Sequence, residues 1–158
     1  MPQIIIHTDG SSRGNPGPGG FGVVLQQVGT QRQKEIAQGY RYTTNNRMEL
    51  LAVIVGLEAL KIENCDVLVV SDSKYVVDAI NQHWIVGWQK KGFKGVKNPD
   101  LWQRFLQVYR KHKVQFQWIK GHNNHPLNER CDFLAVNASK QENLLIDEGY
   151  EQQNLFDI

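Results

Sequence analysis

Residues 3–26 read QIIIHTDGSSRGNPGPGGFGVVLQ, in which two apolar runs flank a segment rich in glycine and proline. Apolar runs of this length favour strands, and glycine and proline mark turns, so the stretch predicts an antiparallel hairpin. A third strand is expected over residues 33–42. The first strand ends at Asp9, which places a carboxylate at the rim of an apolar core.

A long helix is predicted over residues 45–62. It has an Asn or Thr cap, then Glu49, then the run LLAVIVGLEAL, which is apolar around its circumference and must be packed on all sides. At about 100° per residue, Glu58 falls about 180° away from Glu49. We therefore assign Glu58 to solvent and Glu49 to the functional side of the helix.

A buried strand is predicted over residues 66–71, and Asp72 follows it at the sheet edge where open α/β folds bind ligands. The remaining elements are helices that begin at Ser73 and Pro99, a strand over residues 114–118, and a helix capped by Asn128 that carries Asp132. The predicted fold is α/β, with a mixed five-stranded sheet, its first three strands antiparallel, and helices on both faces. Residues 1–140 should form one catalytic domain, and residues 141–158 a flexible acidic tail.

The composition is that of an ordinary globular chain, with 158 residues, 41% of them hydrophobic, and a net charge of +2. No apolar run approaches the roughly 20 residues of a membrane span, and the N-terminus lacks a secretory signal pattern. A cytoplasmic monomer without membrane contact is the expectation. Cys65 and Cys131 lack metal-ligand spacing, so two free, packed thiols are favoured over a disulfide.

Four carboxylates stand where predicted strands or helices begin or end: Asp9, Glu49, Asp72 and Asp132. If they converge, they would repel one another unless a cation lies between them. Oxygen-only ligands suit Mg²⁺ or Mn²⁺, and two such ions would support phosphodiester cleavage. By position alone, four solvated acids at loop boundaries are an equal alternative.

The sequences around these acids weigh against that alternative. They are TDGS (8–11), GNPGPGG (14–20), NNRMEL (45–50), SDS (71–73), KNPDLWQRF (97–105) and KGHNNHPLNERCD (120–132). Together, and in this order from about residue 3 to 140, they closely resemble type 1 ribonuclease H, the bacterial ribonuclease HI family. The resemblance implies an endonuclease that hydrolyses the RNA strand of RNA–DNA hybrids with two Mg²⁺ ions, leaving 5′-phosphate and 3′-hydroxyl ends. Mn²⁺ is a possible substitute.

The resemblance also implies a role for each acid. Asp9 would bridge both metal ions, Asp72 would hold the ion that activates the attacking water, and Asp132 would hold the other. Glu49 would bind metal and touch the ribose 2′-hydroxyl, the group by which RNA is told from DNA. His122 matches a loop histidine implicated in proton transfer or product release.

Substrate contacts are implied for residues near the hairpin and the start of the long helix. Asn15, Asn45 and Asn46 resemble residues that contact sugars and bases, although Asn also favours turns and caps on its own account. Thr44 matches a phosphate-pocket threonine. In this resemblance Gly87 stands where the family usually has an asparagine that accompanies the threonine, which predicts weaker anchoring of the DNA strand there or the use of backbone amides.

Residues 84–97 read WIVGWQKKGFKGVK, an aromatic and basic segment without an acid. The segment resembles the basic protrusion by which the family grips the DNA strand of the hybrid. Lysines neutralise phosphates, and aromatic planes can pack against sugars or bases. The alternative is a solvated basic loop over a small aromatic core. The candidate contacts are Trp84, Trp88, Lys90, Lys91, Lys94 and Lys97.

The C-terminal sequence contains Gln152, Leu155 and Phe156 in a Gln-x-x-Leu-Phe pattern. This pattern resembles the short peptide by which bacterial replication and repair proteins dock on the DNA sliding clamp. The alternative is that Leu155 and Phe156 fold back on the domain or fray.

Two other functions compete with a ribonuclease. A transposase or integrase catalytic domain of the same fold would cluster carboxylates but act on DNA. A non-catalytic hybrid-binding module should have lost a metal ligand, whereas all four acids are present.

Overall fold

The computed structural model describes residues 2–121 and 123–156, and for residues 153–156 only the course of the backbone. Five strands and six helices are present in this part of the chain. In order they are β1 (Ile4–Ser12), β2 (Gly17–Gln27), β3 (Gln33–Thr43), α1 (Asn45–Glu58), β4 (Asp66–Ser71), α2 (Lys74–Asn81), α3 (Trp84–Lys90), α4 (Pro99–Tyr109), β5 (Lys113–Trp118), α5 (Pro126–Ser139) and α6 (Glu148–Phe156).

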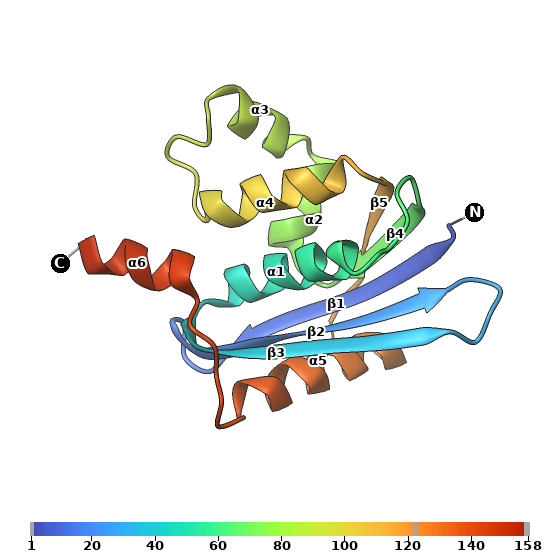
Figure 1. Ribbon diagram of the computed structural model, residues 1–158, viewed down its shortest axis with the longest axis horizontal. Coiled ribbons are helices and arrows are strands. Elements are labelled where there is room, and N and C mark those ends of the chain that lie inside the picture. The colour runs from blue at the N-terminus through green and yellow to red at the C-terminus, as the bar shows by residue number, and fades with distance from the viewer. Residues whose placement is uncertain (1, 122, 157–158) are drawn as a thin grey trace.

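The strands form one mixed sheet in the order β3-β2-β1-β4-β5 (Figure 1). β1 pairs antiparallel with β2, and β2 with β3, whereas β1, β4 and β5 run parallel. Thr8 pairs with Ser71, so Asp9 and Asp72 are the next residues along the two neighbouring chain segments. The predicted end of the first strand at Asp9 was wrong: β1 continues to Ser12, because residues 9–12 still pair with β2. The predicted α/β fold and its three antiparallel strands are confirmed.

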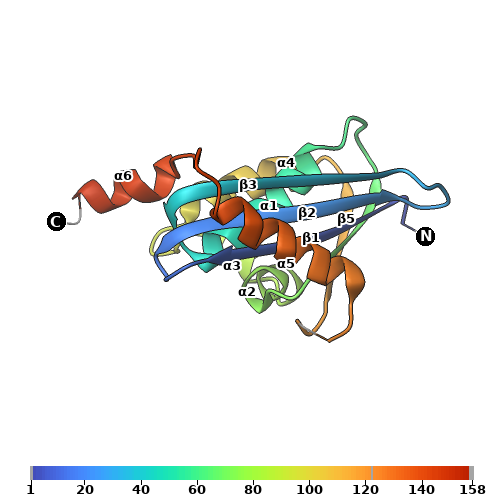
Figure 2. The same cartoon turned by 90° about the horizontal axis from the view of Figure 1, so that it is seen from below.

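Helices cover both faces of the sheet, also as predicted. α1 lies on one face with α2 and α4 above it, and α5 lies across the opposite face (Figures 1 and 2). α1 is apolar all round because it is enclosed between the sheet and α4. Gly10 of β1 lets α1 approach closely, since a Cβ there would collide with the backbone of Met48 and Glu49. None of the helices in the described part of the chain has the length and apolarity to cross a membrane.

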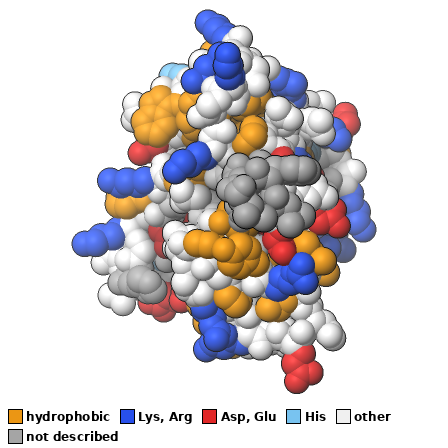
Figure 3. Space-filling view, turned by 90° about the vertical axis from the view of Figure 1, so that its left-hand side faces the viewer, with side chains coloured by type: hydrophobic (Ala, Val, Ile, Leu, Met, Phe, Trp, Pro, Cys, Tyr) orange, Lys and Arg blue, Asp and Glu red, His pale blue; other side chains and the backbone are white. Residues whose placement is uncertain are grey.

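An aromatic cluster supports α3 and the loop after it. Trp102 of α4 is fully buried, and its ring lies 5.2 Å from that of Trp88 and 5.6 Å from that of Tyr75. The indole N–H of Trp102 and the side-chain amide of Asn98 each donate a hydrogen bond to the Tyr75 hydroxyl at 2.9 Å. The cluster holds α3 away from the sheet as a protrusion, over which lysines gather (Figure 3).

The C-terminal segment differs from the expected flexible tail. Leu145 bridges to Tyr40 of β3, and the carboxylate of Asp147 accepts hydrogen bonds from Arg47 Nε at 2.8 Å and Thr43 Oγ1 at 2.7 Å. Arg47 is only 1% exposed although it lies on the apolar helix α1, and Asp147 supplies its counter-charge. The composition of the segment predicted that its acids are solvated. It could not show that one of them, Asp147, pairs with buried Arg47, because the two residues lie 100 positions apart in the sequence.

Both cysteines are free thiols, as predicted. Cys131 of α5 is buried against β1, where its thiol donates to the His7 carbonyl. Glu58 is exposed on α1, as predicted, and it pairs with Arg104, which was not predicted.

Candidate active site

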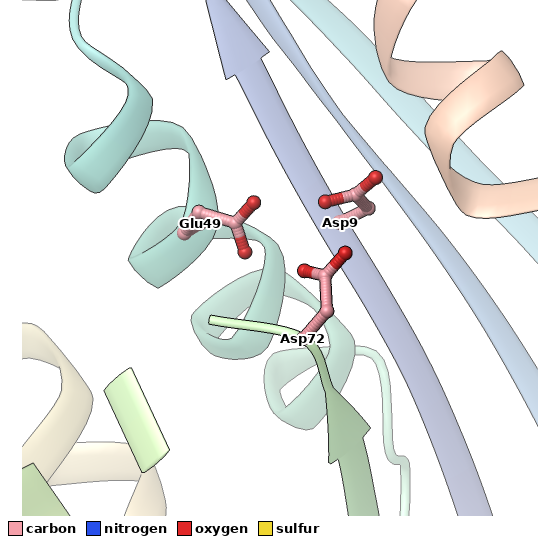
Figure 4. Close-up of side chains that lie close together, drawn as sticks. All are labelled: Asp9, Glu49 and Asp72. Carbon is pink, nitrogen blue, oxygen red and sulfur yellow. The ribbon is translucent and has the colours of Figure 1, made fainter. Parts of the chain in front are cut away.

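Three carboxylates meet at the edge of the sheet: those of Asp9 in β1, Glu49 in α1 and Asp72 directly after β4 (Figure 4). One oxygen from each lies within 4.8 Å of the others. The parallel pairing of β1 with β4 brings the two aspartates together, and the second turn of α1 brings Glu49 over them. The predicted convergence is therefore present for these three residues.

Asp132 lies beside this group but not within it. It is half-buried on α5, and its charge acts with that of Asp72 to raise the pKa of Asp9. The predicted start of the helix was wrong: α5 begins at Pro126 with His125 as its N-cap, so Asp132 sits in the second turn. The physical reason is that proline is favoured in the first turn, where its missing N–H would have no intrahelical partner.

The electrostatics of the group favour a bound cation. Burial, followed by the charges of Asp72 and Asp132, raises the pKa of Asp9 to about 7. Burial and the neighbouring Asp9 also raise the pKa of Glu49 well above its ordinary value. The backbone N–H of Gly10 donates to both side chains, at 2.9 Å to Asp9 and 3.0 Å to Glu49.

One buried atom in the group lacks a partner. Glu49 Oε2 makes no hydrogen bond within the described part of the chain, although a buried carboxylate oxygen is costly to leave unpaired. A cation held by Asp9, Glu49 and Asp72 would satisfy it and offset the mutual repulsion. The donors are all oxygens, which suits a hard divalent ion. The three residues thus fit a metal site.

Two further side chains orient Asp72, and neither was predicted to do so. Asn128, which is 3% exposed, donates its amide to Asp72 Oδ2 at 3.4 Å instead of capping α5. Trp118, at the end of β5, donates its indole N–H to the Asp72 carbonyl at 3.0 Å. In the sequence, the one indication for Asn128 was its place in the NERCD motif. The role of Trp118 follows from its pairing with the residue before Asp72.

The loop after β5 approaches the same carboxylate. A Cβ at Gly121 would lie 2.8 Å from Asp72 Oδ2, so only glycine lets the loop pass without moving that side chain. The candidate histidine, His122, lies outside the described residues.

Comparison with known proteins identifies the scaffold. The model of the RNase H family matches residues 1–140.

The chain belongs to the ribonuclease H family.

Relatives in this family match along almost the whole chain. A ribonuclease H of Desulforamulus reducens is 53% identical over 152 residues, which cover 93% of this chain and 94% of the relative. The solved structure of LC9-RNase H1, a type 1 RNase H with the type 2 active-site motif, superposes with a TM-score of 0.80 at 33% identity, covering 97% and 81% of the two chains. That of LC11-RNase H1 in complex with RNA/DNA hybrid superposes with a TM-score of 0.65 at 30% identity, covering 85% and 95%. The resemblance to ribonuclease H drawn from the motifs is confirmed.

The asparagines and threonine expected to contact substrate in this ribonuclease H family member gather at the start of α1. Asn15 Oδ1 accepts from the Asn45 backbone at 3.1 Å, and Asn45 Oδ1 accepts from the Ser12 backbone at 2.6 Å. Thr44 caps α1 by accepting from the Arg47 N–H at 3.2 Å. These bonds tie the hairpin to the helix, so at least part of each of these three residues' role is structural.

A surface hollow of about 490 Å³ lies beside this junction. Its lining residues are Asn15, Thr44, Asn46, Val96, Lys97, Asn98, Pro99 and Tyr150. Gly87 is not among them and has open space around it. The hollow is therefore lined in part by the loop before α4 and by the C-terminal segment. The sequence had instead placed Gly87 in the phosphate pocket.

The residues of the protrusion divide into two groups. Trp84 is 49% exposed, and the four candidate lysines are also exposed, so they are available to a ligand. Trp88 is half-buried with its ring on Trp102, which gives it a place in the aromatic cluster. The structure contains the solvated lysines and the small aromatic core of the alternative, and the binding of the DNA strand by these lysines stays a prediction.

Proposed function

We propose that this protein is an endoribonuclease that hydrolyses the RNA strand of RNA–DNA hybrids and leaves 5′-phosphate and 3′-hydroxyl ends. The observation that carries the proposal is the meeting of Asp9, Glu49 and Asp72 on a ribonuclease H scaffold, with Glu49 Oε2 buried and unpaired among the described residues. The structure of a relative with bound RNA/DNA hybrid supports the choice of substrate.

Two Mg²⁺ ions, or Mn²⁺ in their place, would be held by Asp9, Glu49, Asp72 and Asp132. Bound there, they would promote attack of water on the scissile phosphate and stabilise the charge of the leaving oxygen. The chain's own contribution is to hold its carboxylates in place. Asn128 fixes one oxygen of Asp72, and Gly10 donates to both Asp9 and Glu49.

Discrimination of RNA from DNA would depend on Glu49, which lies on the helix that begins at the substrate hollow. In this proposal its carboxylate also contacts the ribose 2′-hydroxyl next to the scissile phosphate, a group that DNA lacks. His122 would transfer a proton to the departing oxygen or assist product release. Its position in the sequence supports this role, because Gly121, the residue before it, lies close to the Asp72 carboxylate.

Binding of the hybrid would rest on backbone contacts, with little preference for base sequence. The lysines of the protrusion (90, 91, 94 and 97) would neutralise phosphates of the DNA strand, and Trp84 would pack against a sugar or base. Asn15, Thr44, Asn45 and Asn46 would contact the sugar–phosphate backbone near the start of α1.

The decisive experiment is incubation of labelled RNA–DNA hybrid, duplex RNA and duplex DNA with the protein, with and without Mg²⁺. We expect Mg²⁺-dependent cleavage of the RNA strand of the hybrid alone, and loss of cleavage to background in Asp9→Asn with the fold retained. Cleavage of duplex DNA would favour a transposase or integrase activity. Hybrid binding without cleavage would favour a non-catalytic module. Full activity of Asp9→Asn would contradict the metal site.

We further propose that the C-terminal helix docks on a DNA sliding clamp. The Gln-x-x-Leu-Phe pattern falls on α6, which extends from the body of the domain at the C-terminal end (Figure 2), and Gln152 is exposed. Leu155 and Phe156 would enter an apolar pocket of the clamp. The double variant Leu155→Ala plus Phe156→Ala should lose binding to purified clamp and keep its cleavage rate. Unchanged clamp binding in that variant would rule this docking out.

A further inference from the structure

We propose that Tyr150 is a further substrate-contacting residue, which closes with Lys97 a pocket for one backbone phosphate of the hybrid. The proposal rests on the proposed function, because Thr44 and the asparagines beside Tyr150 are taken to face the same ligand. Tyr150 lies ten residues beyond the end of the family match at residue 140.

The position of Tyr150 carries the proposal. The hollow of about 490 Å³ brings Tyr150 together with Asn15, Thr44 and Asn46, which come from the hairpin turn and the start of α1. The fourth contributor is the loop before α4, including Lys97. The C-terminal segment is therefore one wall of the surface that is proposed to receive the hybrid.

The side chain of Tyr150 is held in place by the fold. Its ring lies 5.6 Å from that of Tyr42 on β3, and the guanidinium carbon of Arg47 is 5.9 Å from its centre. Its backbone N–H donates to the carbonyl of Asp147 at 3.1 Å. Because Asp147 is bonded to buried Arg47, the ring is pre-positioned, and a contact from it would cost little ordering on binding.

The chemistry of the hollow favours a phosphate. Among the described residues that line it, none carries a carboxylate, one is a lysine, and five others offer amide or hydroxyl groups. The nearby acids Asp100 and Asp147 both pair with Arg47, at 2.7 and 2.8 Å, so its guanidinium offsets one of their two negative charges. Lysine and hydroxyl donors of this kind bind phosphate oxygens without reading the base.

The hollow also bears on Gly87, which stands where the family usually has an asparagine. No side chain projects from that position, and it does not line the hollow. Lys97 and Tyr150 supply a charge and a hydroxyl from other elements. In this proposal, Lys97 and Tyr150 supply the phosphate anchoring that the sequence predicted to be weak at Gly87.

The test is the steady-state cleavage of hybrid by Tyr150→Phe, which keeps the ring and removes the hydroxyl. We expect KM to rise about 3- to 10-fold, the range for the net loss of one typical hydrogen bond, with kcat unchanged because the contact lies away from the scissile bond. Tyr42→Phe is the matched control, since Tyr42 packs on Tyr150 but does not line the hollow. Its KM should equal that of the wild type.

A second measurement identifies the phosphate. Single neutral methylphosphonate linkages are placed in turn along the DNA strand and, in a separate series, along the RNA strand. One linkage should raise the KM of the wild type more than that of Tyr150→Phe, which keeps only the Lys97 contact, and its strand identifies the source of the phosphate. An unaltered KM in Tyr150→Phe, or an equal penalty in both proteins at every linkage, would overturn the proposal. If the wild type fails to cleave hybrid, the proposed function itself is wrong. If Thr44→Ala raises KM but Tyr150→Phe does not, the proposed function stands and only the role of Tyr150 is wrong.

Discussion

At the scale of single residues, Asp9 combines opposing requirements. It is 5% exposed and lies beside other carboxylates, which raises its pKa to about 7, yet metal binding requires its ionised form. A bound cation resolves the conflict, because it replaces the proton and neutralises the group. The same logic applies to Glu49, whose pKa is raised by burial and by Asp9.

Metal binding should therefore depend on pH around neutrality. As the pH falls through about 7, Asp9 gains a proton that competes with the cation, so the affinity for Mg²⁺ should decrease. In the metal-free protein, the pKa of Asp9 is higher in the folded state than in the unfolded state. Asp9 therefore contributes to stability at low pH, and this contribution is lost as the pH rises through about 7. The metal-free protein should thus be less stable at pH 8 than at pH 6. Saturating Mg²⁺ should abolish that difference, because Asp9 is then ionised in the folded as well as in the unfolded protein. Urea unfolding at the two pH values, with Mg²⁺ or EDTA, measures this, and an equal loss of stability in both conditions would contradict it.

Asn128 should act on the metal through Asp72. Replacing it by Ala removes the amide that donates to Asp72 Oδ2, and the Mg²⁺ concentration for half-maximal activity should rise about 10-fold. A Mg²⁺ titration of cleavage measures the shift. Asn137→Ala, an exposed asparagine on the same helix, is the control and should titrate like the wild type.

At the scale of elements, the protrusion shows how packing and binding share one segment. Trp88 faces inward onto Trp102, which holds α3 in position, and the lysines are left outside. The alternation was hidden in the sequence because aromatic and basic residues are interleaved without a regular period. Only the position of α4 decides which side of α3 is buried.

The lysines of the protrusion should set the salt dependence of binding. Each of Lys90→Gln, Lys91→Gln and Lys94→Gln that removes a phosphate contact should reduce the slope of log Kd against log salt by about 0.9. Titrations of hybrid by the Asp9→Asn protein at several salt concentrations give this slope. Lys34→Gln on β3 is the control, and an unchanged slope in all three variants would show that these lysines do not touch phosphate.

At the scale of the whole molecule, Arg47 joins three parts of the chain. Its guanidinium is 1% exposed and pairs with Asp100 at the start of α4 and with Asp147 before α6. It lies two residues from Glu49, so one helix carries both a metal ligand and the anchor of the C-terminal segment. That segment is part of the folded domain and a wall of the proposed phosphate pocket.

Removal of Arg47 should therefore destabilise the protein strongly. Arg47→Met leaves the buried carboxylate of Asp147 without its counter-charge, and we expect a loss of about 3 kcal/mol in the free energy of unfolding. Arg104→Met breaks an exposed pair with Glu58 and should cost less than about 1 kcal/mol. Urea denaturation of both variants makes the comparison, and similar losses in the two would contradict the assigned role of the buried pair.

The sequence by itself determined the order of the five strands and of four of the helices, the hairpin, the meeting of Asp9 and Asp72, and the side of the helix that bears Glu49, but it predicted neither α3 nor α6. These follow from local periodicity and from acids that directly follow apolar runs, which neighbouring residues encode. Tertiary structure alone decided that Arg47 pairs with Asp147, that Asn128 serves Asp72 instead of a helix cap, and that Tyr150 shares a hollow with Thr44. Each of these joins side chains far apart along the chain, and their partners are chosen by burial and charge at the point where the folded segments meet.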